Sequence, residues 1–139
     1  MGCWGEKAKR AYHHTAPVNS LYELHKALVV VQEEGLENCW VRHKKNHLRL
    51  KEGLSSLGIT FIVAEQHRLP QLNAVSIPKG VSDSLVRGQL LNQFNLEIGA
   101  GLGRLAVKVW RIGLMGHAWN AKNVDYCINA LASVLKKAA

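Results

Sequence analysis

The sequence is short of cysteine, of proline and of long apolar runs, and each shortage excludes a class of protein. Its 139 residues include 3 Cys and 3 Pro. The cysteines stand far apart, at positions 3, 39 and 127, without the paired spacing of a zinc site or a disulfide framework. No stretch reaches the roughly 18 apolar residues of a membrane span, and the N-terminus lacks a secretory signal pattern. We therefore expect reduced thiols, no metal, no membrane contact and a cytoplasmic location, unless a segment outside this sequence carries an organellar address.

Acidic residues are also scarce, and the net charge is +8. The densest basic stretch covers residues 42–51, where His, Lys and Arg recur on several sides of a predicted helix. No aromatic residue alternates with them to stack on bases, so a solvated helix face is favoured over a nucleic-acid surface. His43 and His47 have the i, i+4 spacing of metal ligands but no evident third ligand.

The order of apolar patterns predicts an α+β fold within one domain-sized chain. Ser20 and Glu23 form a capping box that is expected to open a helix ending at Gly35. Further helices are predicted over 36–57, over 82–93 and from Asn120 or Asn123 onward, the last with Cys127 as a core residue. Short strands are predicted at 59–63, 73–77, 95–98 and 107–114. Together they indicate a two-layer sandwich, with a small, mostly antiparallel sheet of three to four strands and helices packed on one side.

Arg111 is the most informative single residue, because it stands inside the apolar run 109–115. A guanidinium cannot lose its proton, so its burial is costly unless an anion meets it. Its planar fork suits a carboxylate or a phosphate. An internal ion pair, with Glu97 as a possible partner, would satisfy it equally well, and the spacing alone leaves both interpretations open.

A glycine-rich turn, Gly99-Ala100-Gly101-Leu102-Gly103, precedes this run and allows the backbone to approach a ligand closely. Its spacing is similar to that of a dinucleotide-binding loop. That motif requires a following helix, whereas residues 105–114 read as a strand, so we discount it.

Several motifs, in order along essentially the whole chain, resemble the class V pyridoxal-phosphate aminotransferases, closest to their alanine–glyoxylate and serine–pyruvate branch. They are Tyr12-His13-His14-Thr15, Pro17-Val18-Asn19-Ser20-Leu21-Tyr22, Gln32-Glu33-Glu34-Gly35-Leu36-Glu37-Asn38, Arg68-Leu69-Pro70, Leu96-Glu97-Ile98 with the glycine turn, and Lys108-Val109-Trp110-Arg111-Ile112-Gly113-Leu114-Met115-Gly116.

The resemblance implies a C-terminal fragment, with residues 1–19 ending a large cofactor domain and 20–139 forming the small domain with its connecting helix. It implies that Tyr12 and Thr15 bind the phosphate of pyridoxal 5'-phosphate in the neighbouring subunit of a homodimer. It also implies that Arg111 binds the carboxylate of amino-acid and 2-oxo-acid substrates. The family's Schiff-base lysine lies upstream of the matched segment, so neither Lys7 nor Lys9 is assigned that role and the fragment alone is expected to be inactive.

The sequence departs from the family pattern at two positions beside the glycine turn. Arg104 stands where Pro is common, and Val107 where Gly is common. The alternative to a transaminase fragment is a stand-alone binding module. Such a module would hold a small carboxylate through Arg111 or, less favourably, nucleic acid through the basic helix 42–51.

Overall fold

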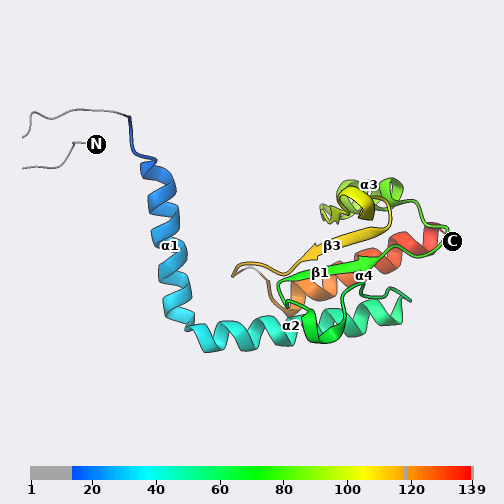
Figure 1. The fold of residues 1–139 in the computed structure, drawn as a ribbon, viewed down its shortest axis with the longest axis horizontal. Coiled ribbons are helices and arrows are strands. Elements are labelled where there is room, and N and C mark those ends of the chain that lie inside the picture. Colours follow the sequence, from blue (N-terminus) through cyan, green and yellow to red (C-terminus); the bar gives the residue numbers. More distant parts are fainter. Residues whose placement is uncertain (1–13, 118, 139) are drawn as a thin grey trace, which may run out of the picture. The chain divides into compact units, whose positions relative to one another are not determined.

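The computed structural model describes residues 14–117 and 119–138, which fall into two compact units that divide between Leu36 and Glu37 (Figure 1). These two units are parts of this chain and do not test a domain boundary in a longer protein. The predicted boundary after residue 19, between two domains of a longer protein, stays a prediction.

The first unit contains helix α1, Val18–Glu34. The helix begins after Pro17, whose carbonyl accepts a hydrogen bond from the Leu21 amide at 3.1 Å. The predicted start at a Ser20–Glu23 capping box is therefore wrong, because both residues lie inside the helix. Proline suits this position, since its fixed φ is already close to helical and the first amides of a helix have no partner within it. Gly35, with φ of 80°, ends the helix as predicted.

The second unit holds the rest of the fold. Helix α2 is Leu36–Ser56, α3 is Asp83–Phe94 and α4 is Ala121–Ala138. The strands are β1 (Leu72–Ser76), β2 (Gly99–Ala100) and β3 (Val109–Gly113). Two 3₁₀ turns, η1 (Glu65–His67) and η2 (Gly103–Leu105), interrupt the connections. Asn120, one of the two predicted starting residues, begins α4 by accepting a hydrogen bond from the Asn123 amide at 3.1 Å.

The strands form one antiparallel sheet in the order β1–β3–β2. The strand predicted at 73–77 is confirmed one residue earlier, as β1, and the strand predicted at 107–114 is confirmed in shortened form, as β3. The strand predicted at 95–98 is wrong, because residues 95 and 96 complete the end of α3: Asn95 is left-handed, with φ of 52°, and the Leu96 amide donates to the Leu90 carbonyl. The strand predicted at 59–63 is reduced to a single bridge between Phe61 and Val75.

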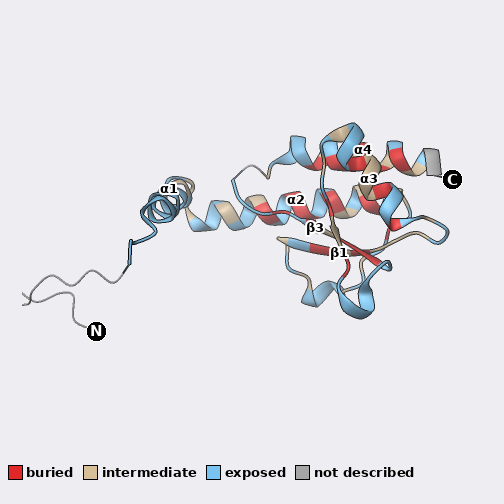
Figure 2. Ribbon diagram, turned by 90° about the horizontal axis from the view of Figure 1, so that it is seen from above, coloured by how far each residue is buried: buried red, intermediate tan, exposed pale blue. Residues whose placement is uncertain are grey.

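The three helices of this unit lie on one side of the sheet, so the predicted α+β two-layer arrangement is confirmed (Figure 2). Gly53 of α2 packs against the side chain of Ile128 on α4, and a Cβ at this glycine would overlap it. The core between the layers is a cluster of buried, mainly apolar side chains. Its largest members are Leu50, Leu54, Ile59, Val75, Val86, Leu90, Trp110, Leu114, Val124, Leu131 and Val134.

Cys127 belongs to this core, as predicted, and burial raises the pKa of its thiol to about 11. The thiol is therefore protonated at neutral pH and acts as a small apolar group. Among the described residues, no helix combines the length and the apolar character that crossing a membrane demands.

Candidate functional site

Arg111 lies at the centre of β3, which is itself the central strand of the sheet. Its neighbours Trp110 and Ile112 are buried in the core beneath the sheet. Because side chains alternate along a strand, Arg111 projects from the opposite face, which the helices do not cover. The residues paired with it across the sheet are Ala74 and Gly99. Two small neighbours leave the half-buried guanidinium room to lie over the sheet.

The backbone of β2 fixes the direction of this side chain. Arg111 Nε donates to the Ala100 carbonyl at 2.8 Å. A Cβ on Gly99 would stand 3.4 Å from Cβ, Nε and Nη2 of Arg111, so any larger side chain there would displace the guanidinium. Gly101 is equally constrained, because a Cβ there would overlap the Leu105 carbonyl. The glycine turn therefore packs closely against Arg111 and Leu105, and its close approach to a ligand stays a prediction.

The two terminal nitrogens of Arg111 remain available. In the part of the chain that the structure describes, no carboxylate forms an ion pair with Arg111. Glu97, the partner suggested by the sequence, is exposed and makes no such pair. An arginine held at Nε and open at its fork can receive a planar anion through two parallel hydrogen bonds.

Asp83, a buried residue that the sequence did not single out, supports β3 from below. Its carboxylate accepts a hydrogen bond from Trp110 Nε1 at 2.9 Å and from Arg87 Nε at 2.8 Å. The Arg87 hydrogen bond is the main cause, with a smaller one from Trp110, of a lowered pKa for Asp83, against the opposing effect of burial. This link fixes α3 to the residue before Arg111.

The next residue pair along the sheet is held by a second buried contact. Asn73, opposite Ile112, accepts a 2.7 Å hydrogen bond from His47 Nδ1 at its Oδ1, and its Nδ2 donates to the Ile112 carbonyl at 3.3 Å. Both side chains are buried. No sequence pattern marks either contact, because the partners are far apart along the chain.

Of the two residues expected at the cofactor phosphate, Thr15 is exposed and lies just before α1. Tyr12 lies outside the described residues. The Thr15 hydroxyl is a group that can donate to a phosphate oxygen, so the residue type fits that role.

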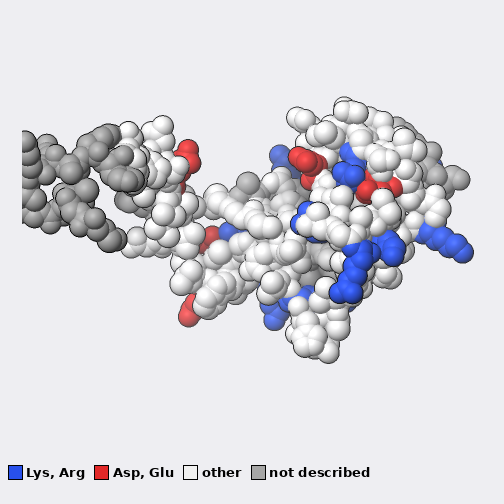
Figure 3. All heavy atoms as spheres, turned by 45° about the horizontal axis from the view of Figure 1, so that its top comes forward, with Lys and Arg blue, Asp and Glu red and all other residues white. Residues whose placement is uncertain are grey.

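The basic stretch 42–51 is largely engaged within the fold. Arg42 donates to the carbonyls of Gly116 and Trp119, and Arg49 forms a two-bond ion pair with Asp125. Lys51 pairs with Glu65, and both histidines of the stretch are buried. On the face drawn in Figure 3, basic side chains lie in separate groups among neutral and acidic ones.

Neither His43 nor His47 belongs to a cluster of three or more metal-binding side chains among the described residues. His43 Nδ1 lies 2.7 Å from the Cys39 carbonyl and 3.4 Å from its Sγ, while His47 contacts Asn73. Within 14–117 and 119–138, no group of three or more His, Cys, Asp or Glu is arranged to hold a metal ion.

Comparison with known proteins shows what the chain is similar to. No family model matches the chain. Alanine–glyoxylate aminotransferase of Mus musculus is 40% identical over 136 residues, which are 97% of this chain and 32% of that protein. (S)-ureidoglycine–glyoxylate transaminase of Bacillus subtilis is 36% identical, over 95% of this chain and 31% of that protein. The chain therefore matches a C-terminal portion of these aminotransferases.

Solved structures agree with this assignment. The crystal structure of alanine–glyoxylate aminotransferase from Nostoc sp. matches with a TM-score of 0.86 and 49% identity, covering 95% of this chain and 34% of that one. Pyridoxamine–pyruvate aminotransferase from Mesorhizobium loti, at 24% identity and a TM-score of 0.84, shares the fold. The chain therefore spans about a third of the length of the aminotransferases it matches. The resemblance predicted from the sequence motifs is confirmed.

Proposed function

We propose that this chain is the substrate-recognition portion of a transaminase that moves an amino group from alanine or serine to glyoxylate or pyruvate. The observation that carries the proposal is the open guanidinium fork of Arg111 on the uncovered face of the sheet. The relatives support it, because their names state amino transfer to glyoxylate.

Arg111 suits both halves of such a reaction. The amino acid and the 2-oxo acid differ at the α-carbon but share the neighbouring carboxylate. Two parallel hydrogen bonds from the Arg111 fork would hold that carboxylate in one plane and so orient the α-carbon. The Ala100 carbonyl keeps Nε engaged, so only the two terminal nitrogens face the substrate. One residue can therefore bind the incoming amino acid and release the 2-oxo acid.

Pyridoxal 5'-phosphate is the cofactor we propose, and it would supply the electron sink that makes the α-proton of the amino acid acidic. In this chain, Thr15 and Tyr12 would hold its phosphate through their hydroxyl groups. We propose that they do so in the partner subunit of a homodimer. The lysine that carries the cofactor is assigned to no residue here, so the 139-residue chain alone is expected to have no transaminase activity.

The test is Arg111→Lys in the whole protein, because lysine keeps the charge but loses the planar fork. We expect the KM for the amino acid to rise about 10- to 100-fold, given ~1.5–3 kcal/mol for a hydrogen bond to a charged group. The melting temperature should change little, since no carboxylate of the described chain depends on Arg111. Steady-state kinetics and thermal unfolding on the same preparations measure both.

Arg49→Lys is the matched control. It makes the same chemical change on α2, where Arg49 contacts Asp125 on α4 and not the open face of the sheet. This control should leave KM unchanged. If Arg111→Lys unfolds the domain while the surviving protein has a normal KM, Arg111 is a structural residue and the proposal fails.

A further inference from the structure

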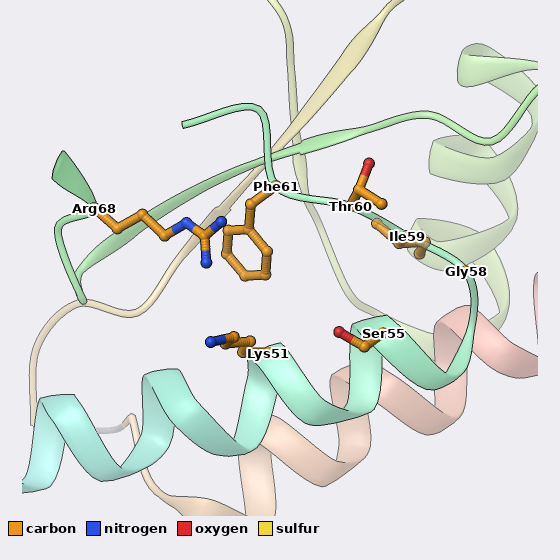
Figure 4. Close-up of a pocket in the computed structure, with 7 residues that line it drawn as sticks. All are labelled: Lys51, Ser55, Gly58, Ile59, Thr60, Phe61 and Arg68. Carbon is orange, nitrogen blue, oxygen red and sulfur yellow. The ribbon is translucent and has the colours of Figure 1, made fainter. Parts of the chain in front are cut away.

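A pocket of about 300 Å³ lies at the C-terminal end of α2, apart from Arg111 (Figure 4). Lys51 and Ser55 of the helix form one wall, and the segment 58–61 forms the other. Arg68 closes one end. All of these residues belong to the second compact unit. The function proposed above uses none of them.

Arg68 is held in place on the sides that do not face the pocket. Its Nε donates to the Val63 carbonyl at 2.8 Å, and its guanidinium carbon lies 4.5 Å from the ring centre of Phe61. Phe61 in turn makes an edge contact with the His47 ring, with centroids 5.7 Å apart. The two terminal nitrogens of Arg68 have no hydrogen-bond partner among the described residues. A fork that is already positioned loses little entropy when it binds an anion.

Two more polar groups turn toward the same space. Figure 4 shows the Lys51 ammonium group and the Ser55 hydroxyl directed into the gap below Phe61 and Arg68. Lys51 is paired with Glu65 at 2.6 Å, but the Glu65 side chain is 69% exposed. Water can therefore take the place of the Glu65 carboxylate beside Lys51 at little cost in free energy. The Thr60 hydroxyl, in contrast, points away and contacts Ser76 Oγ at 2.7 Å.

We propose that this pocket binds a small organic monocarboxylate, at a second site separate from Arg111. The planar fork of Arg68 matches a carboxylate, and Lys51 and Ser55 can complete its hydrogen bonds. Ile59 and Phe61 supply an apolar wall for the rest of the ligand. With Lys51, Arg68 and Glu65 counted together, the site carries one net positive charge, which one carboxylate neutralises.

The experiment titrates pyruvate into the ¹⁵N-labelled 139-residue chain that carries Arg111→Gln. This background removes the site of the proposed function, so the two proposals can fail separately. We expect saturable shifts at the amides of Gly58, Ile59 and Phe61. Adding Arg68→Gln should weaken binding at least about tenfold, because a charged two-bond contact is lost. Lys51→Gln, at a residue on the helix surface, should weaken it by a smaller factor.

Thr60→Val is the matched control, since it alters a pocket residue whose hydroxyl faces away, and it should leave the pyruvate affinity unchanged. Pyruvamide, which is neutral, should cause no saturable shift. The proposal is overturned if pyruvate shifts do not saturate, if both Arg68→Gln and Lys51→Gln bind normally, or if inorganic phosphate binds more tightly than pyruvate. The same holds if pyruvate shifts occur at Arg111 in the unsubstituted chain and vanish entirely with Arg111→Gln.

Discussion

At the scale of the residue, a charge inside an apolar run was predictable and its surroundings were not. Arg111 carries a permanent charge among apolar sequence neighbours. Because burying a charge is costly, the sequence alone identified this residue. Its contacts with Gly99 and Ala100 depend on the pairing of β2 with β3. The sequence predicted a strand four residues too early, at 95–98, and that register would have placed other residues beside Arg111. The pairing with Glu97 was a reasonable alternative that the structure does not contain.

Val107 shows how a departure from a family pattern can have a local physical cost. It adopts φ of 54°, in the left-handed region, and the residue is 72% exposed. A β-branched residue is strained there, by about 1–3 kcal/mol, whereas glycine is not. The sequence comparison with the family noted glycine at this position, and the backbone supplies the reason.

We therefore expect Val107→Gly to stabilise the chain, even though it removes a side chain. Relief of strain should exceed the cost of about 0.5–1 kcal/mol that a flexible glycine adds through the unfolded state. The free energy of unfolding, measured by urea denaturation, should rise by about 1 kcal/mol. Val41→Gly is the control, since Val41 is similarly exposed but lies inside α2, where glycine destabilises. A loss of stability in both variants would show that Val107 is not strained.

At the scale of the element, the ends of helices were predicted well where one residue decides them. Gly35 and Asn120 act through their own backbone or side chain, so their effect can be read locally. The start of α1 was missed because two local signals competed, and Pro17 prevailed over the capping box at Ser20. Contacts between elements, such as Trp110 with Asp83, were not predictable, because nothing in either local pattern specifies the other.

The Asp83 contact makes a prediction about acid stability. Its folded-state pKa is lowered, chiefly by Arg87, so the stabilisation is complete above the unfolded-state value of about 4 and is lost as the pH falls through the lower folded-state pKa. Asp83→Asn should reduce the free energy of unfolding at pH 7 by about 1.5–3 kcal/mol. The difference between this variant and the parent should shrink below pH 4, as urea denaturation across pH would measure.

Asp125→Asn provides the comparison, because Asp125 also has a lowered pKa, caused by Arg49, but both partners are largely exposed. Its effect at pH 7 should be small and should fade as salt is added. Equal effects of the two substitutions, or an Asp83→Asn effect that stays constant down to pH 2, would contradict a buried charged contact between α3 and β3.

At the scale of the whole molecule, the sequence indicated which proteins the chain resembles but not which residues cover its exposed apolar surface. Helix α1 has an apolar stripe at helical spacing, and every apolar side chain of that stripe is exposed in this chain. Its members are Val18, Leu21, Leu24, Leu28 and Val31. A pattern of this kind predicts which side of a helix will be covered, but carries no information about the covering residues. Thr15 is a similar case: its proposed contact with the cofactor phosphate depends on another subunit, which the local sequence does not describe.

The proposed action of Tyr12 and Thr15 across a homodimer can be tested by mixing whole subunits. One subunit carries Tyr12→Phe with Thr15→Ala, and the other lacks the cofactor lysine, so each is expected to be inactive by itself. If the phosphate contacts cross the interface, a mixed dimer contains one site with both lesions and one intact site. Because random mixing makes half of the dimers mixed, roughly a quarter of the parent activity should return. If the phosphate contacts and the cofactor lysine instead come from the same subunit, every site in the mixture carries a lesion and no activity returns. Size-exclusion chromatography of the mixture, before and after subunit exchange, ensures that a null result reflects the location of the contacts and not a failure to exchange.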